Sequence, residues 1–96
     1  MAAYIIGEFE VTDPATYETY RPLAAAAVAK HGGRYLVRGG ATVPLDGSRD
    51  LKRTIVVEFP SLAEARAFYQ SKEYQAALMI RLGSSTGRLF IVEGVS

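Results

Sequence analysis

The sequence has no cysteine and only one histidine among its 96 residues. Disulfide bonds are therefore excluded, and so is a zinc site built from cysteine and histidine ligands. The longest uninterrupted apolar run covers the seven positions 23–29, whereas a membrane-spanning helix needs about 20. The first residues lack the basic region that opens a secretory signal. We therefore expect a cytoplasmic protein with no membrane partner.

An excess of charge of either sign is also missing. Lys and Arg number 11 and Asp and Glu number 10, which gives a net charge of +1. Such a balance offers no electrostatic reason to bind nucleic acid. The strand that carries base-stacking aromatics in RNA-recognition modules corresponds here to 52–59, where the stacking positions hold Thr54 and Val56. We expect no nucleic-acid partner.

What is present is the composition of one globular domain over residues 1–96, with 49% hydrophobic and 22% charged residues. Hydrophobic periodicity predicts four strands, at 4–11, 34–38, 52–59 and 87–95. The second is followed by a bend at Gly39–Gly40 and a further extended stretch at 42–45. Helices are expected from Pro14 to about His31, after Ser61 and after Ser71. Two βαβ halves with right-handed crossovers then give a four-stranded antiparallel sheet with helices on one face. The predicted fold class is α+β, ferredoxin-like βαββαβ.

The second face of this sheet is more apolar than a face in contact with water. Tyr4 and Ile6 lie on the side of the first strand that faces away from the helices. Val56 lies on the same side of the third strand, and the segment 89–92 of the last strand is apolar on both sides. Leaving such side chains in water forfeits about 1.5–3 kcal/mol each. The simplest cover is the same face of a second copy, so we expect a homodimer through the sheet face. The alternative is a monomer with an apolar sheet surface.

Motifs of known chemistry are largely absent. Residues 83–87 match G-x-S-x-G, but a helix precedes them, a strand follows and no histidine comes later, so we interpret them as a connection rather than a nucleophile elbow. No glycine-rich nucleotide loop is present. We expect no cofactor and no metal ion.

The remaining candidates are tyrosines and arginines. Tyrosine carries a hydroxyl on an apolar body, and arginine offers a planar fork that holds a carboxylate at two points. Placed between helices and sheet, these groups would bind a small anionic or carbonyl compound. The alternative is that the tyrosines are core residues and the arginines form salt bridges. His31, at a helix end, is a reserve proton acceptor if it faces the cavity. The candidate binding residues are Tyr17, Tyr20, Arg38, Tyr74 and Arg81.

Several of these residues lie in motifs that resemble a known family. The stretch 32–40, GGRYLVRGG, resembles the GG-x-[FY]-L-x-R-GG core of the domain-of-unknown-function 1330 family. The segments 11–14, 58–61 and 68–75 are similar to the same family, so the resemblance covers essentially the whole chain. It implies a dimeric α+β barrel, in which two ferredoxin-like sheets pack face to face.

The resemblance also implies a class of activity. The wider superfamily includes cofactor-independent monooxygenases, muconolactone-type isomerases and small dehydratases, with pockets between the helices and the sheet. We therefore expect a small cofactor-independent enzyme, monooxygenase-like or isomerase-like, that acts on a small oxygenated organic molecule. A non-catalytic dimeric binding or scaffold module is the alternative. The family's recurring arginine and tyrosine positions coincide with the five candidates, but no catalytic role comes with them.

Overall fold

The computed structural model of the chain describes residues 1–47 and 50–95. Within these residues, four strands and three helices follow one another in the predicted order. Their bounds are β1 Ala3–Val11, α1 Pro14–Lys30, β2 Arg34–Arg38, β3 Arg53–Phe59, α2 Leu62–Gln70, α3 Lys72–Ser84 and β4 Ser85–Glu93. The strands form one antiparallel sheet in the order β2-β3-β1-β4. This is the ferredoxin-like α+β fold that the sequence predicts.

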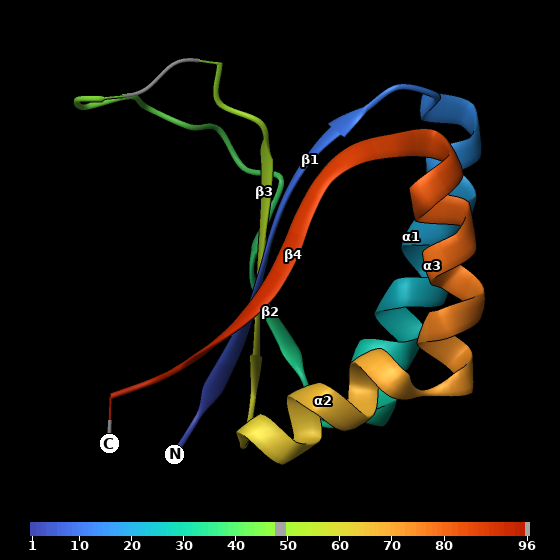
Figure 1. Cartoon of the computed structure of the whole chain (residues 1–96), viewed down its shortest axis with the longest axis vertical. Coiled ribbons are helices and arrows are strands. Elements are labelled where there is room, and N and C mark those ends of the chain that lie inside the picture. The colour runs from blue at the N-terminus through green and yellow to red at the C-terminus, as the bar shows by residue number, and fades with distance from the viewer. Residues whose placement is uncertain (48–49, 96) are drawn as a thin grey trace.

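All three helices cover the same face of the sheet (Figure 1). Successive residues of β1 alternate between this inner face and the outer face, so that Ala3, Ile5 and Phe9 are buried beneath the helices. One side of α1 faces them, with buried residues at the spacing of one helical face: Tyr17, Tyr20, Ala24, Ala27 and Val28. The core therefore lies between the helix layer and the inner face.

Polar residues begin the helices as the sequence predicts. The Asp13 carboxylate accepts hydrogen bonds from the Thr16 amide at 3.3 Å and from the Thr16 hydroxyl at 2.7 Å. These bonds hold the pKa of Asp13 below its ordinary value. Ser61 Oγ accepts from the Glu64 amide at 3.2 Å and begins α2 in the same way.

The segment between β2 and β3 differs from the prediction. The sequence predicts a further extended stretch over 42–45 after the second strand, but 40–47 and 50–52 contain neither strand nor helix. Pro44 lacks the N–H that a strand would donate, and the side chains of Val43 and Leu45 are 78% and 93% exposed. We call these residues the arm. The arm extends from the sheet on the side away from the helices (Figure 1).

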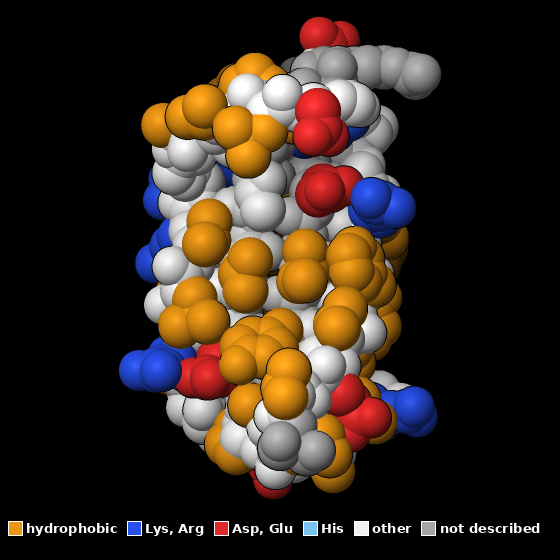
Figure 2. Space-filling view, turned by 90° about the vertical axis from the view of Figure 1, so that its left-hand side faces the viewer, with side chains coloured by type: hydrophobic (Ala, Val, Ile, Leu, Met, Phe, Trp, Pro, Cys, Tyr) orange, Lys and Arg blue, Asp and Glu red, His pale blue; other side chains and the backbone are white. Residues whose placement is uncertain are grey.

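The outer face of the sheet carries apolar side chains over its middle (Figure 2). In the strand register Ile6 lies between Val56 of β3 and Phe90 of β4. Phe90 and Val92 are 39% and 43% exposed. We call Tyr4, Ile6, Val37, Val56, Phe90 and Val92 the outer-face patch. Two ion pairs border it, Arg34–Glu58 at 2.7 Å and Arg88–Glu8 at 2.9 Å.

The two ends of the described chain lie side by side (Figure 1). The Gly94 amide donates a hydrogen bond to the Ala2 carbonyl at 2.7 Å, just beyond the paired ends of β1 and β4. At the opposite end of these strands, the Ser84 carbonyl accepts from the Thr12 amide at 2.9 Å and from the Asp13 amide at 3.1 Å. The connection from β1 to α1 is thereby hydrogen-bonded to the connection from α3 to β4. No helix in the described part of the chain is long and apolar enough to cross a bilayer.

Candidate functional site

A small cavity lies between the helices and the inner face of the sheet. Its volume is about 40 Å³, room for roughly three water-sized positions. Apolar side chains form most of the wall, and no carboxylate of the described residues lines it. The polar lining consists of tyrosines and arginines: Tyr17, Tyr20, Tyr35 and Tyr74, with Arg21, Arg38 and Arg53.

The cavity brings together four of the residues that the sequence singles out. Tyr17 and Tyr20 reach it from α1, Arg38 from the end of β2, and Tyr74 from the first turn of α3. Arg81 does not line the cavity but contacts Tyr74 from behind. His31 is not part of the lining either. Its ring packs edge-on against Phe68 at the C-terminal end of α1, with 6.3 Å between ring centroids.

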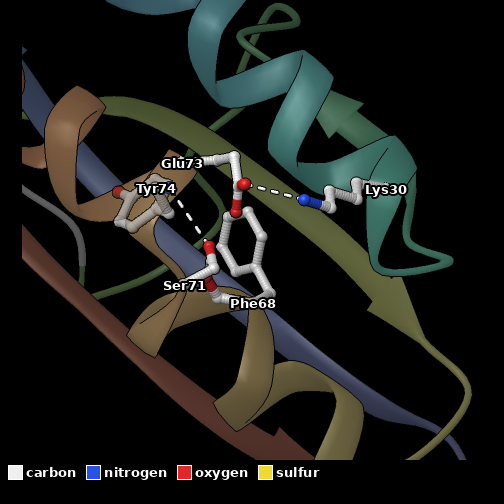
Figure 3. Close-up of polar contacts among 5 residues, drawn as sticks. All are labelled: Lys30, Phe68, Ser71, Glu73 and Tyr74. Atoms are coloured by element: carbon white, nitrogen blue, oxygen red, sulfur yellow. Dashed lines mark hydrogen bonds and ion pairs between the residues drawn. The ribbon is translucent and has the colours of Figure 1, made fainter.

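Tyr74 is held in place by the junction between α2 and α3 (Figure 3). Ser71 Oγ accepts from the Tyr74 amide at 3.1 Å and donates to the Phe68 carbonyl at 2.7 Å, so one side chain ends α2 and begins α3. The Phe68 ring lies 4.6 Å from the Tyr74 ring, centroid to centroid. An ion pair between Lys30 and Glu73 at 2.7 Å joins the end of α1 to the start of α3. These contacts fix the ring of Tyr74 against the cavity.

A chain of hydrogen bonds runs from Arg81 to the cavity. Arg81 Nε donates to Tyr74 Oη at 3.2 Å, and Tyr74 Oη and Tyr20 Oη share a hydrogen bond of 3.0 Å. Only one of the two hydroxyl protons lies in the hydrogen bond between Tyr74 and Tyr20. The other proton is left to be donated to a third acceptor. Burial raises the pKa of Tyr20 and also that of Tyr35. The hydroxyls of Tyr20 and Tyr35 are therefore neutral hydrogen-bond donors at neutral pH.

Arg81 itself is a buried cation. Its residue is 6% exposed, and no carboxylate of the described residues pairs with it. The guanidinium carbon lies 4.7 Å from the centre of the Phe9 ring, an attractive arrangement for a cation and an aromatic face. The positive charge behind Tyr74 polarises the hydroxyl chain toward donation into the cavity.

An irregularity in β2 brings Arg38 to the inner face. Tyr35 pairs with Val57 and Arg38 pairs with Ile55, while Val37 between them pairs with Val56. Strict alternation would put Tyr35 and Arg38 on opposite faces, but the register shift between Tyr35 and Val37 returns Arg38 to the inner side. The Arg38 guanidinium then lies over the Tyr35 ring, 4.4 Å from its centre. Both residues line the cavity.

Sequence reasoning missed three polar residues of the cavity, Arg21, Tyr35 and Arg53. Arg53 could have been found, because it has the same parity in its strand as the inward residues Ile55 and Val57. Arg21 follows Tyr20 directly and forms an ion pair with Glu18 at 3.2 Å. Tyr35 gives no signal of its own, because its position relative to Arg38 depends on the register shift.

A second, larger hollow lies at the other edge of the sheet, between α2 and β4. It has a volume of about 620 Å³ and is a shallow groove open to solvent. Arg66 and Glu93 both line it, so its charges are balanced. Tyr69 lies in this groove and not in the cavity. The groove lacks the convergence of hydroxyls and unpaired cations that the cavity has.

Comparison with solved structures supports the fold. A protein of unknown function from Rhodopseudomonas palustris has a TM-score of 0.80 at 15% identity, over 99% of this chain and 83% of that one. A cofactor-independent oxygenase from Streptomyces nogalater has a TM-score of 0.69 at 14% identity, over 99% and 94%. A dimeric protein of unknown function with a ferredoxin-like fold, from Bacteroides fragilis, has a TM-score of 0.65 at 13% identity, over 97% and 96%.

Comparison of the sequence itself identifies the family. No match is found among curated proteins. A family model, by contrast, matches nearly the whole chain, residues 2–95, in agreement with the motif at 32–40 and the fold described above. The chain therefore belongs to the family described as domain of unknown function DUF1330.

Proposed function

We propose that the chain is a small dimeric enzyme without a cofactor that binds a small oxygenated organic molecule in the cavity. The observation that carries this proposal is that Tyr17, Tyr20, Tyr74 and Arg38 converge on one cavity from two helices and one strand. The hydroxyls would hold an oxygen of the ligand, and Arg38 would anchor an anionic group. Arg81 would act through Tyr74 as a positioning residue. The cytoplasmic location expected from the sequence belongs to the same proposal.

The chemistry that suits this lining is the stabilisation of an enolate or phenolate. Oxygenation without a cofactor and isomerisation next to a carbonyl both pass through such an oxyanion. Neutral tyrosine donors backed by a buried cation stabilise the ionised oxygen more than the neutral one. The likeness in fold to a cofactor-independent oxygenase is consistent with this chemistry. Because the cavity has a volume of only about 40 Å³, a ligand with a ring needs side chains of the lining, such as the half-buried Tyr35, to move aside.

Self-association through the outer-face patch is the second part of the proposal. A second copy, related by a two-fold axis so that the two outer-face patches meet, would cover the apolar side chains that the helices leave exposed. The dimeric state of the structural neighbour from Bacteroides fragilis supports it. In this arrangement each chain keeps its own cavity on the side away from the partner.

Tyr20→Phe is expected to weaken binding of the phenolate form of 4-nitrophenol by about tenfold, because a hydrogen bond to a charged oxygen is lost. The measurement is a spectrophotometric titration across the pH range in which the probe ionises. The wild-type protein should lower the pKa of the bound probe, and Tyr20→Phe should lower it less. Tyr69→Phe, in the separate groove, is the matched control and should behave as wild type. Equal binding by all three proteins would contradict the role of the hydroxyls.

The alternative function, a non-catalytic binding module, predicts a different fate for the ligand. Such a module would bind enols and phenols in the same cavity and release them unchanged. Mass spectrometry of ligand recovered after incubation in air separates the two functions. A product that forms with the wild-type protein and not with Tyr20→Phe would favour the enzyme.

A further inference from the structure

Arg53 is a cation at the inner face of the sheet that forms no ion pair within residues 1–47 and 50–95. It lies opposite Phe9 in the register of β1 and β3 and lines the cavity. Its Nε is buried and has no hydrogen-bond partner among the residues that the structure describes. No carboxylate of the described residues pairs with its side chain. A buried N–H without an acceptor is costly, so this group calls for an acceptor from outside the chain.

The surrounding backbone makes room for this guanidinium. Gly39 has a φ of +72°, and a Cβ at this position would lie 2.6 Å from Arg53 Cζ, closer than atoms can approach. The Tyr17 ring centre lies 5.9 Å from the same carbon. Glycine at position 39 therefore allows this backbone conformation and leaves the space that the Arg53 guanidinium occupies.

Arg38 adds a second cation to the lining of the cavity. It directly precedes Gly39, lines the same cavity, and pairs with no carboxylate of the described residues. Arg21, the third arginine of the lining, already has Glu18 as its partner. Two like charges on one small cavity repel each other, and an anion between them removes that repulsion.

We propose that Arg53 and Arg38 together bind a carboxylate, so that the ligand carries a carboxylate in addition to the oxygen held by the tyrosines. This inference rests on the proposed function and names the class of its substrate. The Nε and Nη atoms of an arginine present two parallel N–H groups that match the two oxygens of a carboxylate. A carboxylate group also fits a cavity of about 40 Å³. For the buried Nε–H to reach a ligand in the cavity, the long Arg53 side chain has to turn.

The test compares benzoate with benzamide, its neutral analogue of the same shape. Both are titrated into the ¹⁵N-labelled full chain, with binding followed by amide chemical shifts in β2, β3 and α1. In the wild-type protein benzoate should bind at least about tenfold more tightly than benzamide, the usual size of a charge-assisted paired contact. Inorganic phosphate, a tetrahedral anion, should bind more weakly than benzoate.

Variants assign the effect to Arg53. Arg53→Gln should raise the Kd of benzoate by about tenfold and leave that of benzamide unchanged, because only the anion needs the charge. Arg53→Lys keeps the charge but loses the fork, and should give an intermediate Kd. Arg66→Gln, the same change at an exposed position of α2, should behave as wild type.

The outcomes separate this inference from the proposed function. Equal binding of benzoate and benzamide to the wild-type protein would overturn the carboxylate assignment and leave the cavity as a binding site. Tighter binding of phosphate than of benzoate would overturn it as well. If neither aromatic compound shifted the amides around the cavity, the proposed function would fall together with the inference. The wild-type comparison needs no variant, so it holds even if Arg53→Gln does not fold.

Discussion

Phe90→Glu is expected to convert the proposed dimer into monomers at micromolar concentration without unfolding the chain. Phe90 lies on the outer-face patch beside Ile6 and is 39% exposed in the isolated chain, so a carboxylate there remains in contact with water. Between two sheets the same carboxylate would lose its hydration, and two-fold symmetry introduces it twice. Each lost phenyl ring also removes about 1.5–3 kcal/mol of apolar burial. Light scattering after size exclusion gives the mass directly.

Met79→Glu is the matched control for this experiment. Met79 lies on α3, on the helix side of the molecule, and is 69% exposed. The same change in charge there should leave the dimer intact. If Phe90→Glu stayed dimeric, the copies would meet through another surface. If the wild-type chain itself were a monomer at this concentration, self-association through the sheet would be wrong.

Gly87→Ala is expected to lower the free energy of unfolding by about 2–4 kcal/mol, because the change introduces both strain and a clash. Gly87 has a φ of +146°, a conformation that residues with a side chain rarely adopt. A Cβ there would overlap the carbonyl oxygen of Glu8 and lie 2.9 Å from the carbonyl carbon, in the neighbouring strand β1. Moving these backbone atoms aside would disturb the hydrogen bonds between β1 and β4.

Gly83→Ala, four positions earlier, should have the opposite effect. Gly83 lies within α3, where a Cβ would meet nothing within 4 Å. Replacing glycine by alanine inside a helix favours folding by about 0.5–1 kcal/mol. Chemical denaturation of both variants and the wild type, at one protein concentration, measures the pair. Similar losses in both variants would show that the close approach of β4 to β1 does not decide stability.

Most of the fold could be predicted because its signals are local. Alternation marks the faces of β1, serine and aspartate side chains begin the helices, and the spacing of Tyr17 and Tyr20 identifies the inner side of α1. The arm could not be predicted in this way. Val43 and Leu45 are residues typical of a strand, but a strand also needs a neighbouring strand to pair with, and the local sequence does not identify one.

The candidate site was only partly predictable, for a similar reason. The tyrosines of α1 follow from helical spacing, whereas the inward position of Arg38 depends on a register shift with respect to β3. The role of Arg53 depends on Gly39, a residue 14 positions earlier whose missing side chain leaves the space for the guanidinium. Contacts of this kind between strands arise only once the sheet has formed.

The hydrogen bond between Gly94 and Ala2 has a consequence for how the chain could be reconnected. Because these residues are neighbours in space, a short flexible linker could join them without disturbing the sheet. New ends could then be opened in the arm between Pro44 and Leu45, where neither residue belongs to a strand or helix. In the resulting circular permutant, β3 would come first and β2 last. The cavity would then be assembled from Arg53 near the beginning of the chain and Arg38 near its end.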